Sequence, residues 1–558
     1  MKDFFKESAG LQVVQLKAAW HRLVEEGPGQ AQFWLIALFV GVLSGLATVG
    51  FRFGIQYLQE ALYGTDDVSH LHSFLGELPW MWVVGIPTLG GLVVGIILHR
   101  FTPDGRVRSV ADVIEGAALN NGRVERRAGL ASALASLITL SSGGSSGREG
   151  PVVHLAAVLS TFISARIKAD GITGRNLMGC AVAAAVAASF NAPIAGALFA
   201  MEVVLRHFAI QAFAPIAVAS VAGSVIARMF FGDGSEFSLA SSTILAFYQE
   251  LPAFFILGLV AAVVGVVLMR LIFWADNVGN RVQASTHLRP WMRPMVTGAM
   301  LGVIALWFPH IIGVGYETTA RALHGDLLLH EAIVFALLKI IAVAITMAGR
   351  MGGGVFSPAL MTGALTGAAF GIIATGVIPN FSGSPTLYAL AGMGAVAASV
   401  LGAPISTTMI VFELTGDWQT GLAVMVAVSS ATALSTRLVD RSFFLTQLMR
   451  RDIQLAAGPQ AYLLKMYSVM SVMRRPDHPS AAPEEHLNEL AESGTYLTAG
   501  QTLRDAMRLF DQSGADYLPV IRASSGEGAP EILGALFQLD ALRTFNKALA
   551  ETAREEHS

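Results

Sequence analysis

Charged side chains are scarce in this sequence of 558 residues. Asp, Glu, Lys and Arg make up 14% of the chain, whereas a soluble globular protein carries about a quarter. The formal net charge of −3 is small for this length, so the composition gives no support for a nucleic-acid partner. Together with a mean hydropathy of +0.57, the scarcity of charge excludes an ordinary soluble protein.

Cysteine is nearly absent, and two common enzyme motifs are absent altogether. The single cysteine, Cys180, excludes an internal disulfide framework. The sequence contains neither an HExxH zinc motif nor a GxxxxGK[ST] phosphate-binding loop, so metal-dependent hydrolysis and ATP-driven pumping have no support. We therefore expect no metal site and no bound cofactor.

Long apolar runs are abundant, and they predict an all-α polytopic membrane protein. Runs such as Ala31–Phe51, Pro79–Leu98 and Pro252–Trp274 exceed the roughly 18 residues that a membrane helix needs. Other apolar stretches are too short to span, so we expect tilted and broken helices among the full-length ones. Residues 1–30 do not resemble a cleavable signal peptide, and we predict a cytosolic amphipathic helix there.

Cationic residues are distributed unevenly between the apolar runs. Four connecting segments are rich in Lys and Arg, and two contain none: the rich ones are Arg100–Arg127, Arg166–Arg175, Arg281–Arg293 and Arg437–Arg451, and the empty ones are Tyr63–Glu77 and Gly232–Glu250. By the positive-inside rule the basic segments are cytoplasmic, and so are both termini. We expect an integral protein of the bacterial inner membrane.

An internal repeat divides the apolar region. Residues 188–194 (ASFNAPI) recur, with one insertion, as residues 398–405 (ASVLGAPI), and a glutamate follows nine positions after each proline: Glu202 and Glu413. A second pair, Gly147–Pro151 and Gly354–Pro358, has nearly the same spacing. Shared Ala/Gly composition alone would not place both prolines in register. We therefore predict two inverted halves, residues 31–230 and 250–452, that meet near the midplane.

The repeated glycine–proline elements predict an anion site. Each one opens a helix, where free backbone N–H groups and the positive end of the helix dipole attract anions. Glu149 lies in the first of these elements, where its carboxylate would compete with a permeant anion, so we interpret it as a gate that protonation opens. The alternative is a first-turn acid that merely stabilises the helix dipole.

A different class of protein also matches part of this region. Residues 144–147 (GSSG) fit the GxSG pattern of intramembrane serine proteases. Such an enzyme needs a histidine base within reach of the serine, and the nearest one, His154, lies on the same segment. We expect no enzyme activity.

The same motifs resemble those of a known family. Gly147–Pro151 resembles the GREGP signature of the CLC chloride channels and chloride/proton exchangers, and Gly354–Pro358 resembles its GxFxP signature. The resemblance covers residues 31–452 and implies a homodimer in the lipid bilayer, with one chloride pathway per subunit. It implies that Glu149 is the gating glutamate. The anion-binding residues that it implies are Ser109, Gly147, Arg148, Glu149, Gly150, Gly354, Val355, Phe356 and Phe444.

The sequence departs from the family pattern at the inner end of that pathway. Residues 108–116 replace the family's GSGIPEIEG and keep Ser109, but they lose both flanking glycines and the proline, and Arg108 adds a positive charge. Ser109 favours chloride over fluoride, and it could also serve as a helix N-cap. Phe444 stands where the family has a tyrosine, so one hydroxyl donor worth roughly 1–3 kcal/mol is missing. Phe444 could equally be a packing residue.

The expected inner proton relay is also altered. Exchangers of this family carry two adjacent glutamates, of which the second accepts the proton, and here the pair is Glu202 and Val203. Valine cannot carry a proton. We therefore predict a passive chloride channel, with a chloride/proton antiporter that uses an unusual inner route as the alternative.

Residues 453–558 have a soluble composition and resemble a single CBS module. Thr498–Met507 predicts a capped amphipathic helix, followed by Ala515–Ile521 and Gly534–Leu542. Phe537 replaces the Ser or Thr of nucleotide-binding modules, although Asp540 is kept. We expect a structural cytoplasmic domain that does not bind nucleotides.

Overall fold

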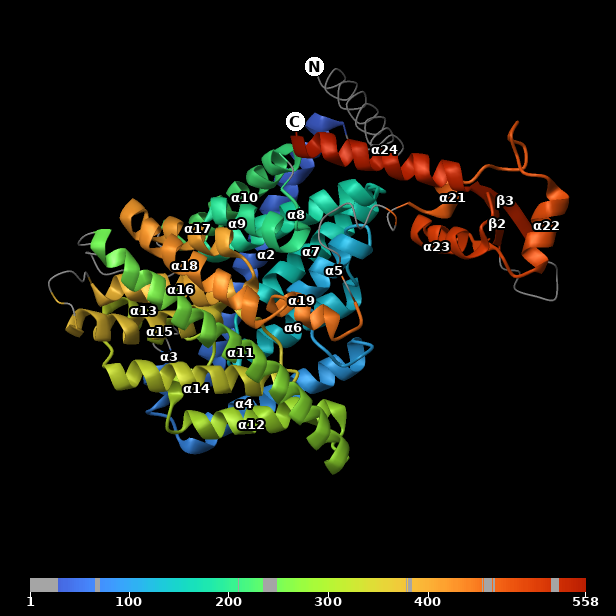
Figure 1. Ribbon diagram of the computed structural model, residues 1–558. Coiled ribbons are helices and arrows are strands. Elements are labelled where there is room, and N and C mark those ends of the chain that lie inside the picture. Colours follow the sequence, from blue (N-terminus) through green and yellow to red (C-terminus); the bar gives the residue numbers. More distant parts are fainter. Residues whose placement is uncertain are drawn as a thin grey trace, which may run out of the picture. The chain divides into compact units, whose positions relative to one another are not determined.

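A computed structural model describes residues 29–65, 71–208, 210–233, 248–377, 379, 384–453, 455, 464, 467–522 and 531–557 (Figure 1). The predicted N-terminal helix over residues 1–30 falls almost wholly outside the described residues. The chain forms two compact units: apart from the short segment Arg206–Ala212, the first unit reaches to Gln454 and the second begins at Leu455.

The first unit is helical throughout its described residues. Its first half contains α2 (Gln30–Tyr63), α3 (Leu71–Leu75), α4 (Trp80–Phe101), α5 (Val110–Leu119), α6 (Arg126–Ser141), α7 (Glu149–Arg166), α8 (Gly171–Phe190), α9 (Pro193–Phe199), a π-helical turn (Ala200–Leu205) and α10 (Ile210–Phe231). Its second half contains α11 (Leu251–Thr286), α12 (Arg293–Ala305), α13 (Tyr316–His324), α14 (Leu329–Ala348), α15 (Phe356–Val377), α16 (Pro385–Leu401), α17 (Pro404–Thr415), α18 (Trp418–Leu438) and α19 (Phe443–Met449), with 3₁₀ turns at Tyr248–Glu250, Pro290–Met292 and Pro309–Ile311.

Eight of the described helical segments are long and apolar enough to cross a membrane. Two shorter apolar segments, Pro193–Leu205 and Pro385–Leu401, are too short to span a bilayer alone. The side chains of α16 are buried on every side, which is typical of a helix at the centre of a membrane bundle. The prediction of an all-α membrane fold with broken helices is therefore confirmed.

The two halves repeat the same local design. Asn191 is the C-cap of α8 and Gly402 is the C-cap of α16, and both residues adopt the left-handed conformation, with φ of 56° and 68°. In each half an alanine follows, and a proline then opens the next helix, α9 at Pro193 or α17 at Pro404. Proline suits the first turn because its missing N–H has no partner there in any case.

The second unit contains a three-stranded sheet with the order β1-β2-β3. Its strands are β1 (Leu497–Thr498), β2 (Tyr517–Arg522) and β3 (Glu531–Phe537), and its helices are α21 (Val469–Val472), α22 (Glu484–Glu492), α23 (Leu503–Ser513) and α24 (Gln538–His557). The pair β1–β2 is parallel and the pair β2–β3 is antiparallel. The predicted helix over Thr498–Met507 begins later, at Leu503, because Thr502 and Asp505 cap it, and residues 497–498 form a strand instead. A small mixed α/β unit of this kind agrees with the CBS-like fold expected from the sequence.

Candidate functional site

A small cavity of about 20 Å³ lies where α5, α7, α15 and α19 approach one another. That volume suits one water-sized particle. Seven of the nine residues expected at the anion site line it: Ser109, Glu149, Gly150, Gly354, Val355, Phe356 and Phe444. Residues from both halves of the sequence therefore surround one central cavity.

The other two expected residues, Gly147 and Arg148, do not line this cavity. Gly147 instead pairs with Gly354 of the other half, and each backbone N–H donates to the partner's carbonyl oxygen at 2.7 Å. A Cβ atom at Gly147 would lie 2.7 Å from Glu149 Oε2 and 3.0 Å from the Ser357 backbone nitrogen, so a larger residue here would displace the Glu149 carboxylate. Arg148 is buried: its guanidinium donates to the Ser189 carbonyl at 3.2 Å, and its Nε lies 3.9 Å from Glu149 Oε1.

The Glu149 side chain is 1% exposed and crosses from its own helix to the other repeat. Its Oε1 accepts a hydrogen bond from Ser357 Oγ at 2.6 Å, and its Oε2 accepts one from the Ser357 backbone N–H at 3.3 Å. Ser357 is the second residue of α15, so the carboxylate sits at the positive N-terminal end of that helix. Glu149 is also the first residue of α7, so the dipole-stabilising alternative holds at the same time.

Ser109 is the N-cap residue of α5, as its alternative interpretation proposed. Asp112, which stands in place of the family's proline, accepts a hydrogen bond from the Ser109 backbone N–H at 2.7 Å. The Asp112 carboxylate also pairs with Arg451 at 2.9 Å. The replacement of the family's proline by Asp112 therefore changes this loop, because the Asp112 carboxylate now binds the Ser109 backbone N–H.

The expected positive charge of Arg108 is compensated by carboxylates, contrary to the sequence interpretation. Its guanidinium lies 2.9 Å from Asp104, 3.3 Å from Glu125 and 3.8 Å from Asp112. Burial alone would lower the pKa of Arg108, but the charges of Asp112 and Asp104 outweigh burial and raise it. Arg108 is thus fully engaged and adds little to the potential of the anion pathway.

The inner end of the cavity is mostly aromatic. Phe444 is buried, and its ring packs edge-on against Phe443 at 5.8 Å between centroids. Gln447, one helical turn after Phe444 on α19, also lines the cavity. Its Oε1 is buried and accepts no hydrogen bond from the described residues. The sequence analysis overlooked both Gln447 and Ser357, although each lies within three residues of an expected site residue.

The two residues expected at the inner proton site lie outside the cavity lining. Val203 is buried and apolar. Glu202 is half-buried and accepts hydrogen bonds from the backbone N–H groups of Ile405 at 3.0 Å and Ser406 at 2.8 Å, and from the Ser406 hydroxyl. Glu202 therefore caps the first turn of α17, which is a structural role that the sequence analysis did not foresee.

The serine-protease alternative lacks its hydrogen-bonded pair. Ser146 Oγ donates to the Gly352 carbonyl at 3.1 Å, which holds the two repeats together. His154 Nδ1 is buried and makes no hydrogen bond within the described residues. Neither residue is arranged as a nucleophile and its base.

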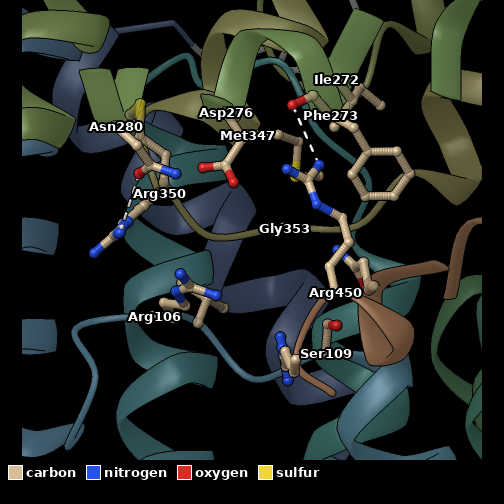
Figure 2. A pocket seen from close by; sticks show the side chains of 14 residues that line it. Arg106, Ser109, Ile272, Phe273, Asp276, Asn280, Met347, Arg350, Gly353 and Arg450 are labelled. Carbon is tan, nitrogen blue, oxygen red and sulfur yellow. Dashed lines mark hydrogen bonds between the residues drawn. The ribbon is translucent and has the colours of Figure 1, made fainter. Parts of the chain in front are cut away.

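A larger cavity of about 260 Å³ adjoins the central one and shares Ser109, Gly353, Met347 and Gln447 with it. Figure 2 shows Arg106, Arg350 and Arg450 around this space, with Ser109 at its edge. These arginines come from three connecting segments. Arg106 and Arg450 lie in two of the basic segments identified in the sequence, and Arg350 follows α14 directly. It therefore forms an electropositive approach to the central cavity.

In the second unit, Asp540, the residue kept from nucleotide-binding modules, is already paired with Arg474. Arg474 Nε donates to Asp540 Oδ2 at 2.6 Å, and the Arg474 guanidinium lies 4.0 Å over the centre of the Phe537 ring. The hydrogen bond to Asp540 raises the pKa of Arg474.

Eight apolar spans, two halves with broken helices, and a central cavity at opposed helix N-termini define the class of anion-transporting membrane proteins. The family model described as voltage gated chloride channel matches residues 90–436. The chain belongs to this family, the CLC family, whose members are channels and transporters of chloride. The resemblance found in the sequence is thereby confirmed.

Relatives and solved structures agree. A ClcB-like protein of Ralstonia nicotianae is 31% identical over 399 residues, which are 70% of this chain and 91% of the relative. The voltage-gated ClC-type chloride channel ClcB of Escherichia coli is 28% identical and covers 74% of this chain and 97% of its own length. A slow cyanobacterial Cl⁻/H⁺ antiporter superposes with a TM-score of 0.67 at 20% identity, over 76% of this chain and 98% of its own. That last likeness is one of fold.

Proposed function

We propose that this chain is a passive chloride channel with one pathway per subunit, gated by Glu149. The observation that carries the proposal is the position of the Glu149 carboxylate, which lines the central cavity and binds Ser357 at the start of α15. A carboxylate that occupies the positive end of a helix excludes a chloride ion from the same place. Protonation removes that charge and frees the position.

The absence of an inner acid supports a channel over an antiporter. Val203 carries no proton, and the carboxylate of Glu202 is occupied by three donors at the start of α17. The Escherichia coli relative is also named as a channel. The antiporter remains the second candidate, because the cyanobacterial protein with the same fold is a Cl⁻/H⁺ antiporter.

Gln447 supplies a polar group where Phe444 lacks the hydroxyl. The two ends of a carboxamide are similar in shape, so a half-turn of the side chain directs its N–H₂ group toward the position that Oε1 now holds. In that orientation Gln447 donates to an anion entering the central cavity. Chloride then keeps one side-chain donor at the inner end of the pathway.

The chain is an integral membrane protein, and its remaining assignments follow from charge and resemblance. The positive-inside rule supports a bacterial inner membrane location with both termini cytoplasmic. The resemblance supports a homodimer, and Ile194 and Ile405, which are half exposed beside the caps of α9 and α17, suit a contact with a second copy. The hydrogen bond from Arg474 to Asp540 supports a C-terminal domain that does not bind nucleotides, because Asp540 is already occupied.

Reconstitution into liposomes with a chloride gradient tests this function. Chloride efflux and proton movement are recorded together for the wild type, Glu149→Gln and, as a matched control, Glu413→Gln. We expect efflux without uphill proton movement, and a faster efflux with little pH dependence in Glu149→Gln. Glu413→Gln should keep the wild-type pH dependence.

Two results would contradict the proposal in different ways. Proton movement at a fixed ratio to chloride would establish the antiporter. An efflux in Glu149→Gln with unchanged rate and pH dependence would remove Glu149 as the gate, even if the protein conducts chloride.

A further inference from the structure

The larger cavity gathers arginines from three separate parts of the first unit. Arg106 comes from the connection between α4 and α5, Arg350 from the connection between α14 and α15, and Arg450 and Arg451 from the end of α19. We call this cavity, with its four arginines, the arginine vestibule. It opens on the side that the positive-inside rule assigns to the cytoplasm.

The acids near the vestibule are already paired. Asp276 lies in its wall and pairs with Arg293 at 3.1 Å. Asp112 pairs with Arg451 at 2.9 Å, which leaves Arg451 compensated. Arg450 donates to the Phe273 carbonyl at 3.2 Å, which is a neutral partner.

Arg106 and Arg350 have no carboxylate partner among the described residues. The Arg350 guanidinium donates only to the Asn280 side-chain oxygen, at 3.3 Å, and the Arg106 side chain makes no hydrogen bond within the described chain. Burial lowers the pKa of Arg350 and the charge of Arg106 lowers it further, although the charges of Asp276 and Asp104 oppose both effects. The net lowering shows that Arg350 and Arg106 repel each other. Figure 2 shows both side chains beside the same open space.

We propose that the arginine vestibule binds a divalent tetrahedral oxyanion of the sulfate and phosphate class, which blocks the inner mouth of the chloride pathway. Two guanidinium groups with free donors match the several oxygens and the double charge of such an anion. One monovalent chloride would compensate only half of the charge of Arg106 and Arg350.

The two cavity volumes explain why this anion would block rather than permeate. The vestibule, at about 260 Å³, holds an oxyanion with part of its hydration shell. It is smaller than the roughly 300–1,000 Å³ of sites that take larger organic ligands, which argues against a whole nucleotide. The central cavity, at about 20 Å³, admits only one water-sized particle. An oxyanion held by Arg106 and Arg350 would thus stand beside Ser109 without passing it.

Isothermal titration calorimetry on the purified full chain in detergent tests the binding step. Sodium sulfate is titrated at constant ionic strength, because exposed charge pairs weaken with salt. We expect saturable binding to the wild type and an affinity about tenfold or more lower in Arg106→Gln and in Arg350→Gln, as each loses a charge-assisted pair. The matched control is Arg166→Gln, an exposed arginine at the end of α7 outside the vestibule, which should bind like the wild type.

Arg106→Gln is the decisive variant, because Arg106 has no side-chain partner whose loss would unfold the protein. Equal sulfate affinity in the wild type, Arg106→Gln and Arg166→Gln would overturn the proposal. Binding of glycerol 3-phosphate without binding of free sulfate or phosphate would also overturn it, because the site would then recognise a lipid headgroup and not a free oxyanion.

A flux measurement tests the block separately. Sulfate added to both sides of the liposome membrane should slow chloride efflux in the wild type and slow it several-fold less in Arg106→Gln. This second step rests on the proposed chloride transport, whereas the calorimetry does not. Binding without any chloride efflux would therefore refute the proposed function and leave the oxyanion site standing, and efflux without binding would do the reverse.

Discussion

Glu202 and Glu413 occupy equivalent places in the two halves, and each one caps a helix of the opposite half. Glu202 accepts hydrogen bonds from the N–H groups of Ile405 and Ser406 at the start of α17. Glu413 accepts hydrogen bonds from the N–H groups of Ile194 and Ala195 at the start of α9, at 2.9 and 2.7 Å. The capping is reciprocal because α9 and α17 pack against each other in opposite directions. Glu202 lies in the turn that follows α9, and Glu413 lies in the last turn of α17.

The reciprocal caps predict that Glu202→Gln and Glu413→Gln lower stability to a similar degree. Each substitution removes a negative charge from a helix N-terminus and one good acceptor, at a cost of about 1–3 kcal/mol. Thermal unfolding of the purified protein in one detergent measures both. If only Glu202→Gln also changed proton movement in liposomes, Glu202 would be a proton acceptor as well as a cap.

Ser357→Ala is expected to open the pathway at neutral pH. Its hydroxyl donates to Glu149 Oε1 at 2.6 Å, and hydrogen bonds to charged groups contribute about 1.5–3 kcal/mol. Losing it should shift the balance toward a displaced Glu149 by about tenfold or more, which is read as faster chloride efflux. Ser146→Ala removes a buried hydroxyl of the same size that does not touch Glu149, so it should leave the rate unchanged.

Phe444→Tyr is expected to strengthen chloride binding. The ring already lines the central cavity, so a hydroxyl on it adds a donor without moving the backbone. The gain should be about 1–3 kcal/mol, measured as chloride affinity by calorimetry. Phe370→Tyr adds the same hydroxyl to a ring of α15 that does not line the cavity, and it controls for a general effect of polarity. An unchanged affinity in Phe444→Tyr would make Phe444 a packing residue only.

Gln447→Leu is expected to weaken chloride binding by several-fold while the protein remains folded. Leucine is close to glutamine in size but donates no hydrogen bond, and Oε1 of Gln447 has no partner in the described structure to lose. Gln447→Glu should weaken binding more strongly, because it places a second negative charge beside the anion. Chloride affinity equal to that of the wild type in both variants would exclude Gln447 from the site.

Most of the fold, and those site residues that lie in local motifs, could be predicted from the sequence. The two glycine–proline elements predicted an anion site at two helix starts, with Glu149 in the first, because Gly and Pro mark a helix start within a few residues. The resemblance to the CLC motifs added Val355 and Phe356. Ser357 could not be assigned in the same way, since its contact with Glu149 spans 208 positions and depends on how the halves pack. The cap made by Glu202 escaped notice for the same reason.

The errors also have local causes. Gly147 and Arg148 belong to the motif but do not line the cavity, because Gly147 pairs with the Gly354 backbone and Arg148 binds the Ser189 carbonyl. The sequence showed that Arg108 adds a positive charge, but not that Asp104 and Glu125, four and seventeen positions away, lie against it. Charge patterns along a sequence do not reveal which charges neutralise one another.

The paired backbone hydrogen bonds between Gly147 and Gly354 bear on how the pathway can move. Rocking one half against the other as a rigid body would break both bonds and separate Ser357 from Glu149 in every transport cycle. If these two hydrogen bonds stay intact, the halves remain fixed to each other and only individual side chains move. If Glu149 gates the pathway as proposed, opening therefore needs only the rotation of side chains beside a fixed backbone contact between the halves.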